Sequence, residues 1–210
     1  MKRLLLKCVA LAALTTTAVQ AQGVPSPANS TTPACISLVG HTGSATSHAL
    51  GEFAVTIRDL ANNPLPNTAI VIDLSGIPEA VLASEQYDPA MTVDCAHRSV
   101  SKLSDATGTA RFTIIGASTG GNASTLLGGG KIYYNGILIG SPTVSIYDLD
   151  GVGGVGANDL SIWLADFGSA IPWGRCDYDC NGGVGANDFS LWLSAYGSGL
   201  MSQSGAPACP

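Results

Sequence analysis

Alternating apolar and polar positions dominate the chain between residues 34 and 147, and they predict β-strands joined by turns. Helical periodicity is missing from this part of the sequence. Eight runs carry the strand pattern: 36–39, 53–57, 69–72, 99–103, 110–115, 131–134, 137–139 and 143–147. Turn-forming residues separate six of them into three strand–turn–strand units, and Asn135-Gly136 in the last unit is typical of a type I′ hairpin turn. We therefore expect a β-sandwich of about seven or eight strands, which we call the strand region.

The pattern changes after residue 147, where a loop followed by a helical period occurs twice. Residues 148–168 and 177–197 are copies, and Gly-Gly-Val-Gly-Ala-Asn-Asp recurs unchanged at 153–159 and 182–188. Apolar residues then follow at helical spacing in both copies: Leu160, Trp163, Leu164 and Phe167, and Phe189, Trp192, Leu193 and Tyr196. Helices of about ten residues are too short to persist alone in water, so we expect the two to pack on each other around the tryptophans.

Acidic residues in both loops follow the ligand spacing of a twelve-residue calcium loop, which uses oxygens at positions 1, 3, 5, 7 and 12 and glycine at position 6. The predicted ligands are Asp148, Asp150, the carbonyl of Gly154 and Asp159 in the first loop, and Asp177, Asp179, Asn181, the carbonyl of Gly183 and Asp188 in the second. Val152 stands at position 5 of the first loop and has no side-chain oxygen. We predict two Ca²⁺ sites, the first weaker, with a water or the Val152 carbonyl at the missing position. Glycine-rich turns and solvated surface carboxylates are the alternative interpretation of each loop taken alone, and the exact duplication argues against it.

Residues 1–21 have a basic start, an apolar run and small residues at their end, and they are typical of a signal peptide. Its removal takes away Lys2, Arg3 and Lys7 and leaves six basic against fifteen acidic residues. This balance provides no basic face for a phosphate backbone, so a nucleic-acid partner is not expected. No later run is long enough for a transmembrane anchor. Residues 22–33, rich in Pro, Ser and Thr, are expected to form a flexible leader.

Five cysteines remain after residue 21, enough for two disulfide bonds in an oxidising compartment. Sequence alone does not fix the pairing. The preferred arrangement joins Cys35 to Cys95 and Cys209 to Cys176 or Cys180. Zinc binding at Cys176 and Cys180 is a weaker alternative, because no second close Cys or His pair accompanies them.

A catalytic site is not expected. His41, His48 and His97 accompany Asp94, Arg98 and several serines, from which a Ser/His/Asp nucleophile could be assembled on paper. However, no nucleophile-elbow pattern and no pair of placed carboxylates occurs outside the calcium-type loops. Trp163 and Trp192 are interpreted as core residues rather than as a platform for sugars.

Two family resemblances refine the picture. Residues 55–67, VTIRDLANNPLPN, and 104–114, SDATGTARFTI, resemble bacterial Ig-like domains of the invasin and intimin kind. This resemblance implies a non-catalytic spacer or adhesive domain over 34–147, although residues 76–98 are longer and less regular than that pattern and are a candidate binding loop.

The duplicated loop and helix at 148–197 resembles type I dockerin domains, which implies calcium-dependent folding and docking onto a cohesin-like or other cell-surface protein. Ala157, Asn158, Ala186 and Asn187 match the positions where such domains contact their partner, and their identity in both copies implies a nearly two-fold docking face. Val152, Cys180 and the lack of a linker before Asp148 depart from that family.

The sequence therefore predicts a mainly β protein with a small α part: an Ig-like β-sandwich at 34–147 and a dockerin-like calcium-binding domain with its tail at 148–210. We expect a secreted, non-catalytic bacterial protein of extracellular attachment or assembly. The alternative is a carbohydrate- or surface-binding Ig-like adhesin in which the calcium-binding part is only a structural cap.

Overall fold

The computed structural model describes residues 23–40, 49–121, 129–169, 173–197 and 208–210. Within these ranges the chain forms eleven strands, two α-helices and two short 3₁₀ helices, η1 (Ala49–Gly51) and η2 (Gly174–Cys176). The prediction of a mainly β chain with a small α part is confirmed. The segment 1–21, predicted as a signal peptide, lies outside the described residues.

Five strands form one layer of the strand region. Their order across the sheet is β10 (Ile137–Gly140), β9 (Lys131–Tyr134), β3 (Ala69–Asp73), β6 (Ser99–Leu103) and β5 (Thr92–Asp94), with every neighbouring pair antiparallel. Ile70 and Ile72 of β3 point into the core, whereas Val71 between them is only half buried. The alternation seen in the sequence therefore corresponds to one buried and one outer face.

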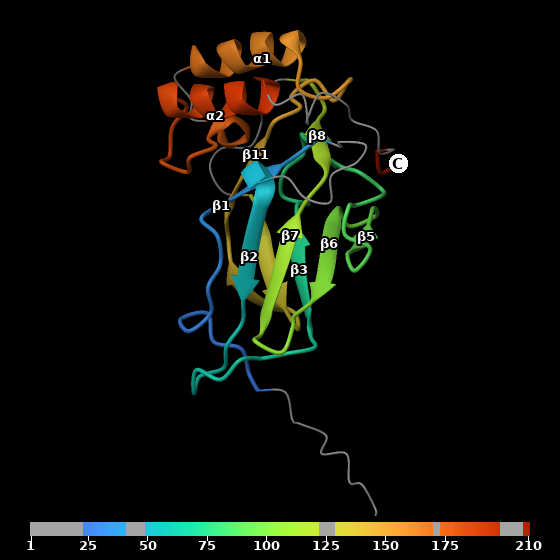
Figure 1. Ribbon diagram of the computed structural model, residues 1–210, viewed down its shortest axis with the longest axis vertical. Coiled ribbons are helices and arrows are strands. Elements are labelled where there is room, and N and C mark those ends of the chain that lie inside the picture. The colour runs from blue at the N-terminus through green and yellow to red at the C-terminus, as the bar shows by residue number, and fades with distance from the viewer. Residues whose placement is uncertain (1–22, 41–48, 122–128, 170–172, 198–207) are drawn as a thin grey trace, which may run out of the picture.

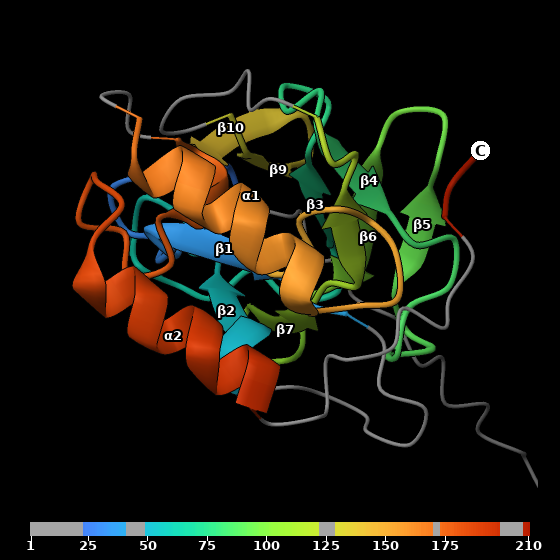
Figure 2. The same cartoon turned by 90° about the horizontal axis from the view of Figure 1, so that it is seen from above.

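Three strand pairs make up the rest of the strand region, and Figure 2 shows β2 and β7 opposite the five-stranded sheet. They are β2 (Glu52–Thr56) with β7 (Thr109–Thr113), β4 (Ala80–Leu82) with β8 (Gly116–Ser118), and β1 (Cys35–Leu38) with β11 (Thr143–Ile146). The β1–β11 pair is parallel, and a bridge between Val39 and Ile115 links β1 to the chain between β7 and β8. Both layers contribute to one core, and the first and last strands of the region lie side by side in it.

Only one of the three expected strand–turn–strand units is a hairpin. Strands β9 and β10 pair across Asn135 and Gly136, which both have positive φ, as a type I′ turn requires. Strands β2 and β3 belong to different layers, and so do β6 and β7, so the other two units connect the layers. In the second of these units, the Asp105 N–H donates to the Thr109 carbonyl at the turn. Outside the turn, β6 pairs with β3 and β7 pairs with β2.

The expected leader and candidate binding loop are both partly paired. Bridges join Pro25 to Asp59 and Thr31 to Thr56, so the described part of 22–33 lies along the β2 edge rather than extending freely. The irregular segment 76–98 contains strands β4 and β5. These strands and β8 have three residues each, too few for an alternating pattern to predict them.

The disulfide pairing differs from the preferred one. Cys35 is bonded to Cys180 and Cys95 to Cys209, with Cα–Cα distances of 5.8 and 5.2 Å, and Cys176 is a buried free thiol. The preference assumed that bonds stay within each part of the sequence, whereas packing places the second acidic loop against β1. Because Cys180 is in a disulfide, the zinc interpretation of Cys176 and Cys180 is also wrong. The two bonds fit an oxidising environment.

Helices α1 (Ala157–Phe167) and α2 (Ala186–Gly197) lie side by side across one end of the strand layers (Figures 1 and 2). Trp163 and Trp192 are 2% and 1% exposed, and the Phe189 ring lies between them, 4.8 and 6.4 Å from their ring centroids. The expected packing around two tryptophans is confirmed. Among the described residues, no helix has the length and apolar character needed to cross a membrane.

Candidate metal centres

The first acidic loop follows β11 directly and leads into α1. Carboxylate oxygens of Asp148, Asp150 and Asp159 all lie within 4.8 Å of one another. Asp148 and Asp159 are 0% and 1% exposed, while Asp150 is half buried. Three sequence-predicted ligands are therefore brought together at one point below the start of the helix.

The second acidic loop repeats this arrangement before α2. Carboxylate oxygens of Asp177, Asp179 and Asp188 also lie within 4.8 Å of one another, and Asp177 and Asp188 are buried. Asn181 lies in the same loop, where its Oδ1 accepts the Gly183 N–H at 3.0 Å and its Nδ2 donates to Asp179 Oδ2 at 2.9 Å.

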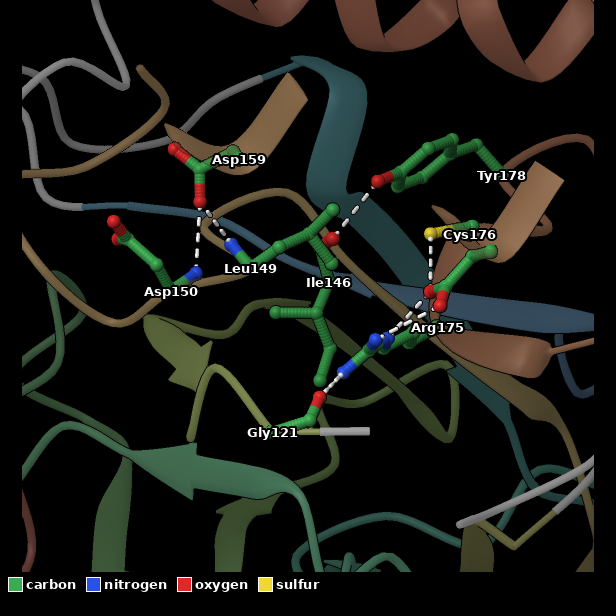
Figure 3. Close-up of polar contacts among 9 residues, drawn as sticks. Gly121, Ile146, Leu149, Asp150, Asp159, Arg175, Cys176 and Tyr178 are labelled. Atoms are coloured by element: carbon green, nitrogen blue, oxygen red, sulfur yellow. Dashed lines mark hydrogen bonds and ion pairs between the residues drawn. The ribbon is translucent and has the colours of Figure 1, made fainter. Parts of the chain in front are cut away.

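The last aspartate of each loop organises the backbone in the same way. Asp159 Oδ1 accepts the N–H groups of Leu149 and Asp150 at 2.5 and 2.8 Å (Figure 3), and its Oδ2 accepts that of Gly156 at 2.6 Å. In the second loop Asp188 accepts the corresponding N–H groups of Tyr178, Asp179 and Gly185 at 2.7, 3.1 and 2.8 Å. Each aspartate also lies in the first turn of its helix, where a negative charge is favoured by the helix dipole.

Glycines at position 6 allow both loops to close. Gly153 and Gly182 have φ of 74° and 92°, in the left-handed region that residues with a Cβ seldom adopt. Gly154 and Gly183, whose carbonyls are the predicted ligands at position 7, follow directly, and Gly154 is buried. Val152 at position 5 is 73% exposed, in contrast to the polar Asn181 at the same position of the second loop.

Burial and crowding make these carboxylates difficult to ionise without a cation. Burial, and next the charge of Asp159, raises the pKa of Asp148 from 3.8 to about 6. Burial likewise raises the pKa of Asp159, and burial together with the charge of Asp188 raises the pKa of Asp177. A divalent cation would offset both effects, because it neutralises the carboxylates where water cannot reach them.

The donor set fits a hard divalent cation. Every predicted ligand atom is an oxygen, which Ca²⁺ and Mg²⁺ prefer over nitrogen or sulfur. Asp148 Oδ2 is buried and has no hydrogen-bond partner among the described residues. A buried carboxylate oxygen without a partner is costly in a folded protein, and a bound cation at this point would satisfy it.

Loops and helices are fixed to the strand region by contacts that the sequence did not reveal. The rings of Tyr147 and Tyr178 stack with centroids 4.5 Å apart, and the Tyr178 hydroxyl donates to the Ile146 carbonyl at 2.9 Å (Figure 3). The Cys35–Cys180 bond joins β1 to the second loop. Residues 148–197, which we call the loop–helix unit, therefore share a core with the strands rather than forming a separate body.

A buried ion pair adds a further link. Arg175 binds both carboxylate oxygens of Asp166 at 2.6 and 2.9 Å and donates to the Gly121 carbonyl at 2.7 Å, while the Cys176 thiol donates to Asp166 at 3.2 Å (Figure 3). The side chains of Arg175 and Asp166 are 2% and 6% exposed. Asp166 follows Trp163 by three residues and therefore shares its buried face of α1, and this spacing is the signal that the sequence offers for a buried charge.

The residues expected to contact a partner are all at the surface. Ala157, Asn158, Ala186 and Asn187 are exposed in the first turns of α1 and α2. Half of the predicted apolar positions of the helices are also exposed: Leu164, Phe167, Leu193 and Tyr196, at 43–52%. Asp159, Asp166 and Asp188, the charged residues of the two helices, are buried, so the outer surface of the helix pair is uncharged.

Of the three histidines considered for a nucleophilic site, the described residues include only His97. His41 and His48 lie outside the described residues. His97 Nδ1 is 2.7 Å from Asp94 Oδ2 on an exposed turn, and the hydrogen bond to His97 lowers the pKa of Asp94. The pair is local, three residues apart, as expected of a solvated turn.

Comparisons with known proteins found no match, so the proposed function rests on the geometry of the chain itself. No protein family model matches this sequence, and no curated protein and no solved structure matches it either.

Proposed function

We propose that this protein is a secreted, non-catalytic calcium-binding protein of extracellular attachment or assembly. The observation that carries the proposal is the duplicated carboxylate cluster, with each set of oxygens inside 4.8 Å and with Asp148 Oδ2 buried and without a partner among the residues that the structure describes. All-oxygen ligands at the spacing of a calcium loop favour Ca²⁺ over softer metals. Mg²⁺ demands stricter octahedral geometry and keeps more of its water.

Attachment would use the outer surface of the helix pair. Its exposed residues carry no charge although the chain is acidic overall, and depletion of charge together with exposed aromatic and aliphatic side chains is typical of the core of a protein interface. Ala157 and Asn158 repeat as Ala186 and Asn187, so the two ends of this surface are chemically alike. The resemblance to type I dockerins makes a cohesin-like or other cell-surface protein the proposed partner, and the strand region would serve as an Ig-like spacer.

Calcium titration by calorimetry tests the first part of the proposal. We expect two unequal binding events, with the weaker one assigned to the first loop through its loss in Asp159→Asn, while Asp188→Asn removes the stronger one. Two equal tight sites, or no heat of binding above that of a buffer blank, would contradict the assignment of ligands.

Partner capture tests the second part. The double variant Ala157→Asp/Ala186→Asp places a charge at both ends of the proposed surface without touching the ligands, and Thr92→Asp on the exposed edge strand β5 is the matched control. We expect calcium-dependent binding to cohesin modules or to the bacterial surface fraction to be lost in the double variant and kept in the control.

A second candidate function has specific support. The Tyr147–Tyr178 stack and the Cys35–Cys180 bond favour a loop–helix unit that caps a carbohydrate- or surface-binding strand region. In that case the double variant would still bind the surface as well as the control does.

A further inference from the structure

A hollow of about 520 Å³ is lined by the paired strands β4 and β8 on one side and by the first acidic loop on the other. Asp150 and Gly151 line it on the loop side, and Ser118 and Thr119 line it at the end of β8. Ser118 N–H donates to the Asp148 carbonyl at 2.8 Å, and a Cβ on Gly151 would lie 2.5 Å from the Ser118 carbonyl oxygen. Loop and strand are thus in close contact, and the hollow ends at a ligand residue of the first loop.

Two buried oxygens at this junction have no hydrogen-bond partner within the part of the chain that the structure describes. Asp148 Oδ2 belongs to the carboxylate cluster, and Ser118 Oγ, on a residue 2% exposed, belongs to the lining of the hollow. Buried polar atoms are almost always satisfied in folded proteins, so the unpartnered oxygen of the carboxylate cluster indicates a bound cation. Ser118 Oγ is not accessible from the hollow, so it offers no contact to a ligand there.

The first loop also supplies one ligand fewer than the second. Position 5 is Val152, whose exposed side chain has no oxygen, where the second loop has Asn181. Calcium takes six to eight oxygen ligands, and molecules outside the protein such as water can supply some of them. A cation bound in the first loop therefore has one coordination position left for an oxygen that the protein does not supply. Asp150 of this loop borders the hollow.

Charge decides which oxygen is favoured. The carboxylates of Asp148, Asp150 and Asp159 exceed the charge of a divalent ion by one, so the occupied loop stays negative. The lining of the hollow contains no Lys, Arg or His among its described residues. An anionic ligand would therefore be repelled, whereas a neutral ligand with paired hydroxyl groups would not.

We propose that the first loop and the hollow form a calcium-dependent binding site for a neutral saccharide, in which vicinal hydroxyl oxygens complete the coordination of the ion. This inference rests on the calcium binding proposed above. The hollow falls within the range of about 300–1,000 Å³ typical of small-ligand sites. The exposed Thr119 provides a hydroxyl for hydrogen bonds, and the partly exposed Val81 provides apolar contact for the carbon face of the sugar.

The experiment is calcium titration of the full chain with and without methyl glycosides of mannose, galactose and glucose. A glycoside that binds with a Kd of about 10 mM, added at about 100 mM, should tighten first-loop calcium affinity about tenfold by linkage. The second-loop affinity should not change. Sodium acetate, an anionic oxygen donor, and 1,3-propanediol, which lacks vicinal hydroxyls, should not reproduce the effect.

Val152→Asn supplies the missing protein ligand and leaves the hollow intact. We expect this variant to bind calcium more tightly at the first loop and to lose the glycoside effect, while Val24→Asn, the same change at an exposed distant valine, behaves like the wild type. Calcium binding that none of the three glycosides changes, or an equal glycoside effect in Val152→Asn, would overturn the saccharide site and leave the calcium proposal standing. Absence of first-loop calcium binding would overturn both.

Discussion

Between about pH 4 and pH 6, the stability of the protein should fall with rising pH in the absence of calcium and rise with pH in its presence. Asp148→Asn should therefore stabilise the chelated protein and destabilise the calcium-bound protein. Asp148 is fully buried, and its pKa is raised from 3.8 to about 6 by burial and by the charge of Asp159. In the chelated protein the folded state therefore holds a proton that the unfolded state has already released. Stability contributed by this proton is present below about pH 4 and is lost as the pH rises toward about pH 6.

The magnitude follows from the size of that shift. Moving a carboxyl pKa from 3.8 to about 6 corresponds to about 3 kcal/mol of unfolding free energy. The raised pKa values of Asp159 and Asp177 act in the same direction. Carboxylates with lowered pKa, such as Asp88 beside Lys102, act in the opposite direction but below about pH 4, so the two windows are separate.

Calcium changes the sign because it binds the ionised carboxylates. With saturating calcium the unfolding free energy should rise between about pH 4 and pH 6, as protons no longer compete for the ligands. Asp148→Asn keeps an oxygen that can accept the Gly151 N–H, at 2.8 Å from Asp148 Oδ1 in the wild type, and removes the buried charge. At about pH 7 it should be more stable than the wild type in EGTA, by up to about 3 kcal/mol, and less stable than the wild type in calcium.

Urea unfolding followed by tryptophan fluorescence measures these changes, because Trp163 and Trp192 are buried in the loop–helix unit. Asp88→Asn is the matched control, since it weakens the partly buried ion pair with Lys102, which lies outside both acidic loops, and its cost should be the same with and without calcium. A chelated wild type that gains stability from about pH 4 to pH 6, or an Asp148→Asn variant that is destabilised in EGTA, would refute the reasoning.

Two further predictions concern the links between the loop–helix unit and the strands. Replacing Cys35 and Cys180 together by serine opens a bond that spans 145 residues and should lower the unfolding free energy by about 5 kcal/mol; unchanged denaturant midpoints would mean that these two cysteines are not paired. Arg175→Met leaves Asp166 as an unpaired buried charge and should lower the unfolding free energy by about 3–5 kcal/mol. The double variant with Asp166→Leu should recover much of that loss in the same unfolding assay. A double variant as unstable as Arg175→Met would contradict this account of the pair.

Sequence by itself determined the elements whose signal is local. Alternation and apolar runs predicted eight strands, of which β3 has one buried face while β1 and β11 are buried on both. The repeat spacing of 148–168 and 177–197 placed three carboxylates of each loop in one cluster. Both predictions hold because a turn, a helix cap and a ligand loop depend on residues a few positions apart. The predicted ligand set needed no knowledge of the rest of the chain, although its use for calcium stays a prediction.

Only the tertiary structure decided how these elements are joined. The parallel pairing of β1 with β11, the two connections between layers, and the Cys35–Cys180 bond all link residues far apart in sequence, where periodicity carries no information. The same holds for the hollow beside Asp150, whose lining comes from strands and a loop that are remote along the chain. Burial of the shared core decides these contacts, because Tyr178 and its neighbours can leave water only by packing against β11 and β1.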